Sequence, residues 1–265
     1  MGITHMIVDS LTHITPNGRW FSTAYDASTR TLLQQMDNAG LERAVVVALA
    51  DYIENEFVLS ECIKHSDRLI PGASINPIKY KNLNDASVQI KAIFEKGDYK
   101  ILKLHPRLHK YDLSDFRFLH ILNEVVENKI KVNIWLDTLL RYPGAIIRTS
   151  PIDAIRRVLE QFPSINFVLL HACGPEILNL AESIRGYNNV LIDVSYTMHR
   201  FIGSSVALDL SFLFDKLDKK IIFGSDFPEV SIMQALDDFT LLSKSISLEK
   251  QNRILCNNLL TLLNV

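Results

Sequence analysis

The sequence predicts an α/β fold, a (β/α)8 TIM barrel that the whole chain, residues 1–265, forms as a single domain. Its length of 265 residues is close to the usual size of one such barrel. Short apolar runs rich in β-branched residues alternate with longer stretches that carry apolar residues at helical spacing. The short runs are continuously apolar, which is typical of parallel strands buried on both faces.

Eight candidate strands follow one another along the chain. Ser28 can cap the first helix between them, and Gly40 follows the end of that helix. An open doubly wound sheet is the competing architecture, but no glycine-rich phosphate turn follows the first run. No low-complexity linker divides the series, which favours a closed barrel. The expected strands are Met6–Asp9, Arg43–Ala48, Leu69–Ile75, Ile101–Leu104, Val132–Leu136, Phe167–His171, Val190–Val194 and Ile221–Gly224.

The composition excludes several classes of partner. The formal net charge of −2 provides no strong field for nucleic acid or an acidic membrane, and no apolar run is long enough to cross a bilayer. Cys62, Cys173 and Cys256 lack CxxC spacing and favour a reducing compartment. Because no export signal is visible, we expect a cytoplasmic protein. His5 lies in a segment that could precede the natural start of the protein, so we assign it no functional role.

Polar residues stand where most of the predicted strands end. In a (β/α)8 barrel the carboxyl ends of the strands form the active-site rim, so these residues are expected to meet. Imidazole, ammonium and carboxylate groups together suit a divalent metal ion or general acid–base chemistry. Some of these strand-end residues also have simpler interpretations. Asp226 could serve merely as the cap of the next helix, and Asp9 is expected to be structural. The candidates are His13, Lys103, His105, Asp137, His171, His199, Arg200 and Asp226.

Four segments resemble the amidohydrolase superfamily, in its amidohydrolase-related (amidohydrolase family 2) branch of hydrolases and decarboxylases. They are Ile7-Val8-Asp9-Ser10-Leu11-Thr12-His13, Lys103-Leu104-His105-Pro106, Phe167-Val168-Leu169-Leu170-His171 and Ile222-Phe223-Gly224-Ser225-Asp226-Phe227-Pro228. They occur in the expected order over the whole chain. The last segment is the most specific, and the closing stretch from Arg253 to Leu260 is similar to the final helix of the family.

The resemblance implies a site with a divalent ion, usually zinc, that activates a water molecule. His13 matches the second histidine of the HxH pair, His171 the histidine after strand six, and Asp226 the catalytic aspartate after strand eight. Lys103 lies near the lysine position after strand four. The first histidine of the pair is Leu11 here, and the strand-five histidine is Trp135. Neither residue can bind zinc, so the resemblance implies a degenerate metal site.

Two interpretations of this site remain open at equal weight. Residues two apart on a strand share a face, so Asp137 could replace part of the lost cage beside Trp135. A relocated zinc site would then use His13, Asp137, His171 and Asp226, with His105 as a further candidate. In the metal-free interpretation, Asp226 and His171 act directly as acid and base while Lys103 or an arginine binds the substrate. Trp135 would then form a flat wall for a planar ring.

Cationic residues in the expected rim loops predict an anionic small-molecule substrate. The substrate-binding candidates are His105, Arg107, Trp135, Arg141, His199 and Arg200, and Tyr111, Tyr142 and Tyr196 could line the same pocket. We therefore expect a hydrolase of a carboxylated lactone, ester or amide. A decarboxylase of the same family and a non-catalytic small-molecule binding protein are the alternatives. The outer helices could also support a homodimer.

Overall fold

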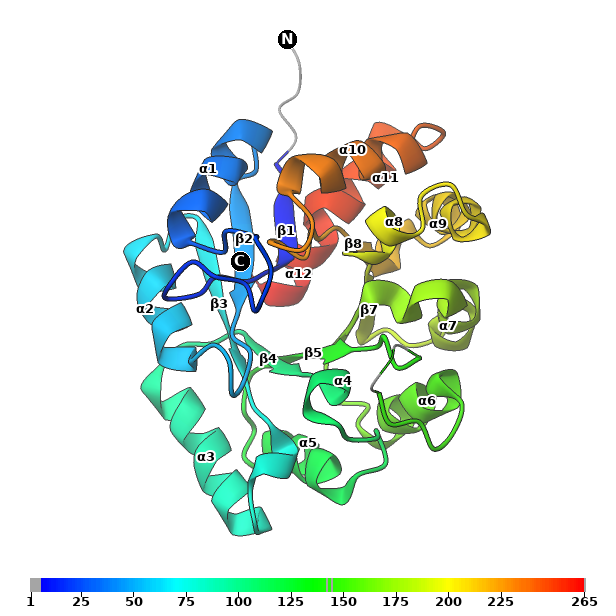
Figure 1. Cartoon of the computed structure of the whole chain (residues 1–265). Helices are drawn as coiled ribbons and strands as arrows, with labels where there is room; N and C mark the ends of the chain where they lie inside the picture. Colours follow the sequence, from blue (N-terminus) through cyan, green and yellow to red (C-terminus); the bar gives the residue numbers. More distant parts are fainter. Residues whose placement is uncertain (1–5, 142, 144, 265) are drawn as a thin grey trace.

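The computed structural model describes residues 6–141, 143 and 145–264, and it forms a (β/α)8 TIM barrel (Figure 1). Eight parallel strands pair in sequence order from β1 to β8, with helices between them. The strands are β1 (Val8–Thr12), β2 (Arg43–Val47), β3 (Leu69–Ser74), β4 (Ile101–Leu104), β5 (Asn133–Asp137), β6 (Phe167–Leu170), β7 (Val190–Asp193) and β8 (Ile221–Ile222).

Helices cover the outside of the strands, and the loops that join strands to helices form the rim (Figure 1). The first helix begins and ends as the sequence predicts, because Ser28 accepts a hydrogen bond from the Thr31 amide and Gly40 ends it in the left-handed conformation. The helices are α1 (Thr29–Ala39), α2 (Asn55–Lys64), α3 (Leu83–Lys96), α4 (Pro106–His109), α5 (Phe116–Glu127), α6 (Pro151–Gln161), α7 (Ile177–Ile184), α8 (Thr197–Arg200), α9 (Ser205–Lys216), α10 (Ile232–Leu242), α11 (Leu248–Asn252) and α12 (Asn258–Leu263).

The last strand meets the first through backbone hydrogen bonds just beyond β8. The Ser10 amide donates to the Phe223 carbonyl over 3.0 Å, and the His13 amide donates to the Phe227 carbonyl over 2.8 Å. Asp9 contributes to the same seam, since its Oδ1 accepts from the Ser225 amide at 3.0 Å. Asp9 is therefore structural, as predicted, and the seam fixes where the residues after β1 and β8 stand.

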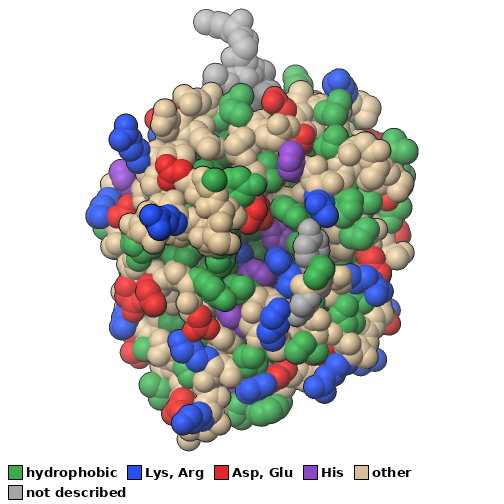
Figure 2. Space-filling model, in the orientation of Figure 1, with side chains coloured by type: hydrophobic (Ala, Val, Ile, Leu, Met, Phe, Trp, Pro, Cys, Tyr) green, Lys and Arg blue, Asp and Glu red, His purple; other side chains and the backbone are tan. Residues whose placement is uncertain are grey.

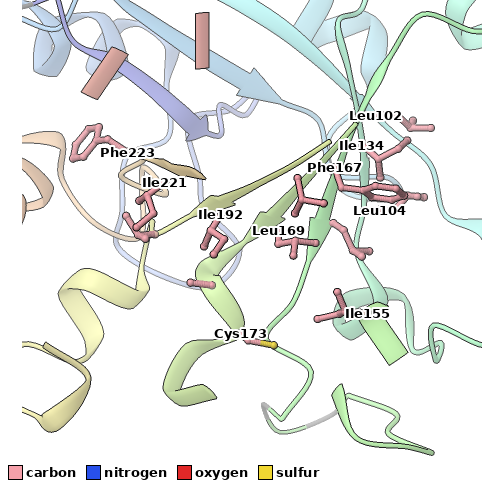
Figure 3. Packing of buried hydrophobic residues seen from close by; sticks show 14 of the residues in the cluster. Leu102, Leu104, Ile134, Ile155, Phe167, Leu169, Cys173, Ile192, Ile221 and Phe223 are labelled. Carbon is pink, nitrogen blue, oxygen red and sulfur yellow. The ribbon is translucent and has the colours of Figure 1, made fainter. Parts of the chain in front are cut away.

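Side chains alternate along β4 to β6 between two buried layers. Leu102, Leu104 and Leu169 face outward and pack under the helices, in the cluster that Figure 3 shows. Ile101 on β4, Trp135 on β5 and Val168 on β6 fill the inside of the barrel. The next inward positions on β4 and β5 are Lys103 and Asp137, both buried. The interior thus changes from apolar to charged toward the rim.

The observed strands match the eight predicted runs, with small shifts at the ends. β1 begins two residues later than predicted and continues to Thr12, because it extends along β2 with a register shift between Asp9 and Thr12. β8 is shorter than predicted. The three cysteines are free and buried. Among the residues that the structure describes, no helix combines the length and apolar character that a membrane span requires.

Candidate active site

A cavity of about 280 Å³ lies at the carboxyl end of the barrel, where the rim loops converge. Figure 2 shows histidine and cationic side chains gathered in the central hollow of this face. The predicted residues His13, Lys103, His105, Arg107, His171 and Asp226 all line it, so strands β1, β4, β6 and β8 contribute to one site. The other lining residues are Trp20, Phe21, Leu49, Leu108, Leu139, Tyr196 and Glu229.

His13 and Lys103 form a direct contact on one wall of the cavity. His13 Nδ1 lies 2.6 Å from the Val47 carbonyl oxygen, which can only accept, so Nδ1 carries the proton. The other ring nitrogen, Nε2, therefore accepts a hydrogen bond from Lys103 Nζ over 3.0 Å. Burial lowers the pKa of Lys103 to about 8, and burial with the Lys103 charge lowers the pKa of His13 well below its usual value. The pair presents a buried ammonium to the cavity.

Asp226 stands beside this pair, directly after β8. Its Oδ1 lies 4.0 Å from His13 Nε2, and burial raises the pKa of its carboxyl to about 6. It adopts a left-handed backbone conformation with φ of 64°, and its amide donates to the Leu11 carbonyl at 3.0 Å. The N-cap of the next helix is Ser231, so Asp226 does not cap that helix. A carboxylate with this pKa can accept a proton near neutral pH.

His171 sits on a strained turn after β6. Three consecutive residues with a Cβ, His171, Ala172 and Cys173, have positive φ values between 51° and 61°. Such a run is costly and persists only where neighbours hold it. Asp193 Oδ1 accepts from the His171 amide at 3.2 Å, and Thr197 Oγ1 donates to the His171 carbonyl at 2.7 Å. The surrounding loop thus fixes the position of the imidazole.

Asp193 accepts several hydrogen bonds in this network, and the sequence alone did not identify it as a site residue. It accepts hydrogen bonds from the hydroxyls of Ser10 and Ser195 as well as from the His171 amide. A Cβ on Gly224 would lie only 2.5 Å from Asp193 Oδ2, so the close approach of β8 requires glycine there. These contacts join β1, β6, β7 and β8 beneath the site.

Asp137 lies at the end of β5, fully buried below the cavity. Its Oδ2 is 3.3 Å from Arg107 Nη2 and 3.6 Å from Nε2 of both His105 and His171. Burial alone would raise the pKa of Asp137, but these partners outweigh it and hold the pKa well below its usual value. Asp137 faces the barrel interior like Trp135, as the strand period predicts.

A family model described as Amidohydrolase matches residues 8–264. The chain belongs to this amidohydrolase family. The resemblance found in the sequence is therefore confirmed. No curated protein matches the chain.

Solved structures share the fold of this amidohydrolase at low sequence identity. An uncharacterized TIM-barrel protein from Bordetella bronchiseptica is 18% identical over 98% of both chains, with a TM-score of 0.78. A probable 2-pyrone-4,6-dicarboxylic acid hydrolase from Acinetobacter baumannii, with citric acid bound, is 17% identical over 98% and 99% of the two chains, with a TM-score of 0.69. A 5-carboxyvanillate decarboxylase from Novosphingobium aromaticivorans, in complex with manganese and a nitrobenzoic acid, is 12% identical over 100% and 98%, with a TM-score of 0.69.

The side chains present do not fit the metal centre that the amidohydrolase family implies. The structure brings His13, His171, Asp137 and Asp226 to one end of the barrel, yet among the described residues no three or more His, Cys, Asp or Glu side chains form a group that could hold a metal ion. The Lys103 ammonium occupies the position 3.0 Å from His13 Nε2, where a cation would bind this nitrogen. Asp137 is engaged by Arg107 and two imidazoles. The relocated zinc site is therefore not formed by this arrangement.

The predicted role of Trp135 as a wall of the cavity is wrong. Its side chain is fully buried among the apolar residues inside the barrel, and its Nε1 donates to the Ser10 carbonyl over 3.0 Å. Leu11 belongs to the same apolar cluster. Leu11 and Trp135, which replace the family histidines, therefore fill the barrel below the cavity. Leu11 on β1 and Trp135 on β5 precede His13 and Asp137 by two residues, and side chains at this depth pack into the apolar interior of the barrel.

Several rim cations predicted to bind substrate lie outside the cavity lining. Arg141 is exposed and pairs with Glu176 at 3.0 Å, and His199 Nδ1 pairs with Asp238 at 2.9 Å. Arg200 is exposed and does not line the cavity either. Among the tyrosines, Tyr196 lines it, Tyr111 is buried elsewhere, and Tyr142, like His5, is outside the described residues.

The aromatic wall comes instead from the loop between β1 and α1. Trp20 stacks on His13 with ring centroids 5.3 Å apart, and its Nε1 donates to Glu229 Oε1 over 2.6 Å. Phe21 packs edge-on against Trp20. The sequence signal that could have found them is a Trp-Phe pair in a long loop that follows a strand at the rim.

Proposed function

We propose that this amidohydrolase is a single-domain hydrolase that cleaves a lactone, ester or amide bond in a small carboxylated molecule, using its own side chains as acid and base. The observation that carries the proposal is the convergence of Asp226, Lys103 and His13 in one largely buried cavity. The carboxyl has a pKa of about 6 and the ammonium a pKa of about 8. Near pH 7 a proton acceptor and a cation therefore coexist side by side.

Asp226 is the proposed general base. Its carboxylate removes a proton from a water molecule, whose oxygen forms the new bond to the carbonyl carbon of the substrate. The electron pair of the carbonyl bond moves onto its oxygen. A base with a pKa near 6 is both deprotonated at neutral pH and basic enough to be effective.

Lys103 is the proposed stabiliser of the developing oxyanion. Its ammonium is buried, and His13 Nε2 accepts one of its hydrogens and thereby fixes its direction. A fixed cation in a site with little water stabilises a developing negative charge more than it would in solution. The Val47 carbonyl sets the His13 tautomer and so contributes indirectly.

Asp226 is also the proposed general acid. It returns the proton gained from water to the leaving oxygen or nitrogen as the bond to the carbonyl carbon breaks and the carbonyl re-forms, which restores its carboxylate. His171 lines the cavity and is the proposed contact that positions the substrate there. Its Nδ1 lies 3.2 Å from the Ser195 carbonyl oxygen and therefore carries a proton, while Nε2 faces the Asp137 carboxylate.

Arg107 is the proposed anchor for a substrate carboxylate. It lies in the first turn of the short helix α4 after β4, lines the cavity and is partly exposed there. A guanidinium suits a carboxylate geometrically and electrostatically. The apolar lining from Trp20, Leu108 and Leu139 suits the carbon skeleton of the same molecule.

A substrate panel with matched pairs tests the proposal. Lactones, esters and amides that carry a carboxylate should be hydrolysed by the wild-type protein, and their methyl-ester counterparts more slowly. The Asp226→Asn variant should be inactive on the same panel. Release of CO2 from aromatic carboxylates without hydrolysis would favour a decarboxylase, and tight binding without turnover would favour a binding protein; either result would contradict the proposal.

A further inference from the structure

Asp137 contacts three side chains of the cavity but does not line it. A single oxygen, Oδ2, is near Arg107, His105 and His171 at 3.3, 3.6 and 3.6 Å. The carboxylate is fully buried, and the described residues give its Oδ1 no hydrogen bond. All three partners line the cavity. The single atom Asp137 Oδ2 therefore lies next to three side chains that line the cavity.

Two of the three partners direct a hydrogen-bearing nitrogen at this atom. His105 Nδ1 accepts from the Leu108 amide over 3.3 Å, so a neutral His105 carries its proton on Nε2, the nitrogen near Asp137. The guanidinium of Arg107 is a permanent cation, and its Nη2 donates to Oδ2 over 3.3 Å. The third partner, His171, directs Nδ1 at the Ser195 carbonyl and lies with Nε2 3.6 Å from Asp137. A carboxylate is the side chain that accepts from Arg107 and also faces the protonated nitrogen of His105.

We propose that Asp137 is a positioning residue, not a metal ligand, that orients Arg107 and His171 toward the substrate and fixes the orientation of the His105 ring. The roles of Arg107 and His171 in this inference rest on the proposed function. Arg107 is 29% exposed, and Asp137 is the buried carboxylate that draws its guanidinium toward the barrel interior. The His105 and His171 rings lie against the same carboxylate oxygen, so its loss would change the surroundings of both imidazoles.

The proposed role requires the negative charge of Asp137 as well as the shape of its side chain. An Asn at position 137 keeps the size of the side chain and one acceptor oxygen, but it removes the negative charge and adds an amide that donates hydrogens. A neutral oxygen holds the guanidinium of Arg107 and the Nε2–H of His105 more weakly than a carboxylate does. Asp137→Asn is therefore a small change in volume with a large expected change in the orientation of three residues.

Nitrogen NMR of the histidine side chains in the ligand-free protein tests the inference without any substrate. In folded Asp137→Asn the imidazole signals of His105 and His171 should shift, while those of His13 stay in place. Arg107→Gln, at a partly exposed position, should shift the same two histidines through Asp137. The matched control is Asp238→Asn, which removes another buried carboxylate that contacts a histidine, His199, outside the cavity.

The outcomes separate this inference from the proposed function. Unchanged His105 and His171 signals in folded Asp137→Asn would overturn the inference. If that variant does not fold, unchanged signals in Arg107→Gln overturn it instead, and shifted signals support it. A protein that shows these shifts but hydrolyses nothing in the substrate panel would leave Asp137 as a positioning residue while the proposed function fails.

Discussion

Asp137 and Asp226 are two buried carboxylates at the same end of the barrel, but their surroundings differ. Asp137 is shared by a guanidinium and two imidazoles within 3.6 Å, and its pKa is held well below the usual range. Asp226 has only the unprotonated His13 Nε2 at 4.0 Å as a close contact of this kind among the described residues, and burial raises its pKa to about 6. Asp226 lines the cavity and Asp137 does not.

The difference shows how one residue type can take two roles in one site. A carboxylate beside a guanidinium and two imidazole rings stays ionised and makes a stable anchor, but it is a poor proton acceptor. A carboxylate that burial destabilises is a better base. The environments therefore favour Asp226 for proton transfer and Asp137 for orientation. Each prediction below tests this division.

Asp226→Asn should have the largest effect. The carboxamide cannot accept a proton from water, so we expect kcat to fall by about 10²–10⁴-fold with a small change in KM. Steady-state kinetics on a hydrolysed substrate of the panel measures this, with thermal unfolding as a check on the fold. Retention of more than a tenth of wild-type kcat would rule out Asp226 as the base.

Arg107→Gln should have the next largest effect, on binding more than on the chemical step. Loss of a charged hydrogen bond, worth about 1.5–3 kcal/mol, should raise KM for a carboxylated substrate by about 10–100-fold. The matched controls are Arg141→Gln and Arg200→Gln, because these exposed arginines lie outside the cavity lining. Equal increases of KM in all three variants would contradict a specific anchor at Arg107.

The pH dependence of activity should reflect Asp226 and Lys103 but not Asp137. Asp226 must be deprotonated, so activity should fall as the pH drops below about 6. Lys103 must be protonated, so activity should also fall as the pH rises above about 8. Each limb should approach a tenfold change per pH unit, measured as kcat/KM in buffers of constant ionic strength. A Lys103→Arg variant that keeps the alkaline limb at the same pH would contradict the assignment to Lys103.

Removal of divalent metal should have the smallest effect. Because Lys103 holds the position beside His13 Nε2, we expect dialysis against a chelator to leave kcat unchanged. Elemental analysis of the same sample should show no stoichiometric zinc or manganese. Loss of activity on chelation, with recovery on adding one of these ions, would contradict a site built from side chains alone.

The barrel and much of the site could be predicted from the sequence because both follow from strand periodicity. Eight apolar runs mark the strands, and the residues that end them meet at one rim. The same period correctly places Asp137 on the inward face with Trp135. It does not reveal the height of a side chain within the barrel, so Trp135 was expected in the cavity although it packs below it.

The remaining contacts depend on loops, which carry no such period. Trp20 reaches His13 from a long irregular segment, and Glu229 holds its indole from the loop after β8. Arg107 meets Asp137 because a short helix turns back after β4. Arg141 and Arg200 resemble Arg107 in the sequence, but their loops place them outside the cavity. Only the folded chain distinguishes these three arginines.

The most direct test of the division between the two carboxylates compares Asp226→Asn and Asp137→Asn on one carboxylated substrate and its neutral amide. We predict that Asp226→Asn lowers kcat for both molecules with little change in KM. Asp137→Asn should instead raise KM for the carboxylated molecule, by about tenfold or more, and leave KM for the amide nearly unchanged. Equal losses of kcat in the two variants, with the same KM on both molecules, would contradict the division.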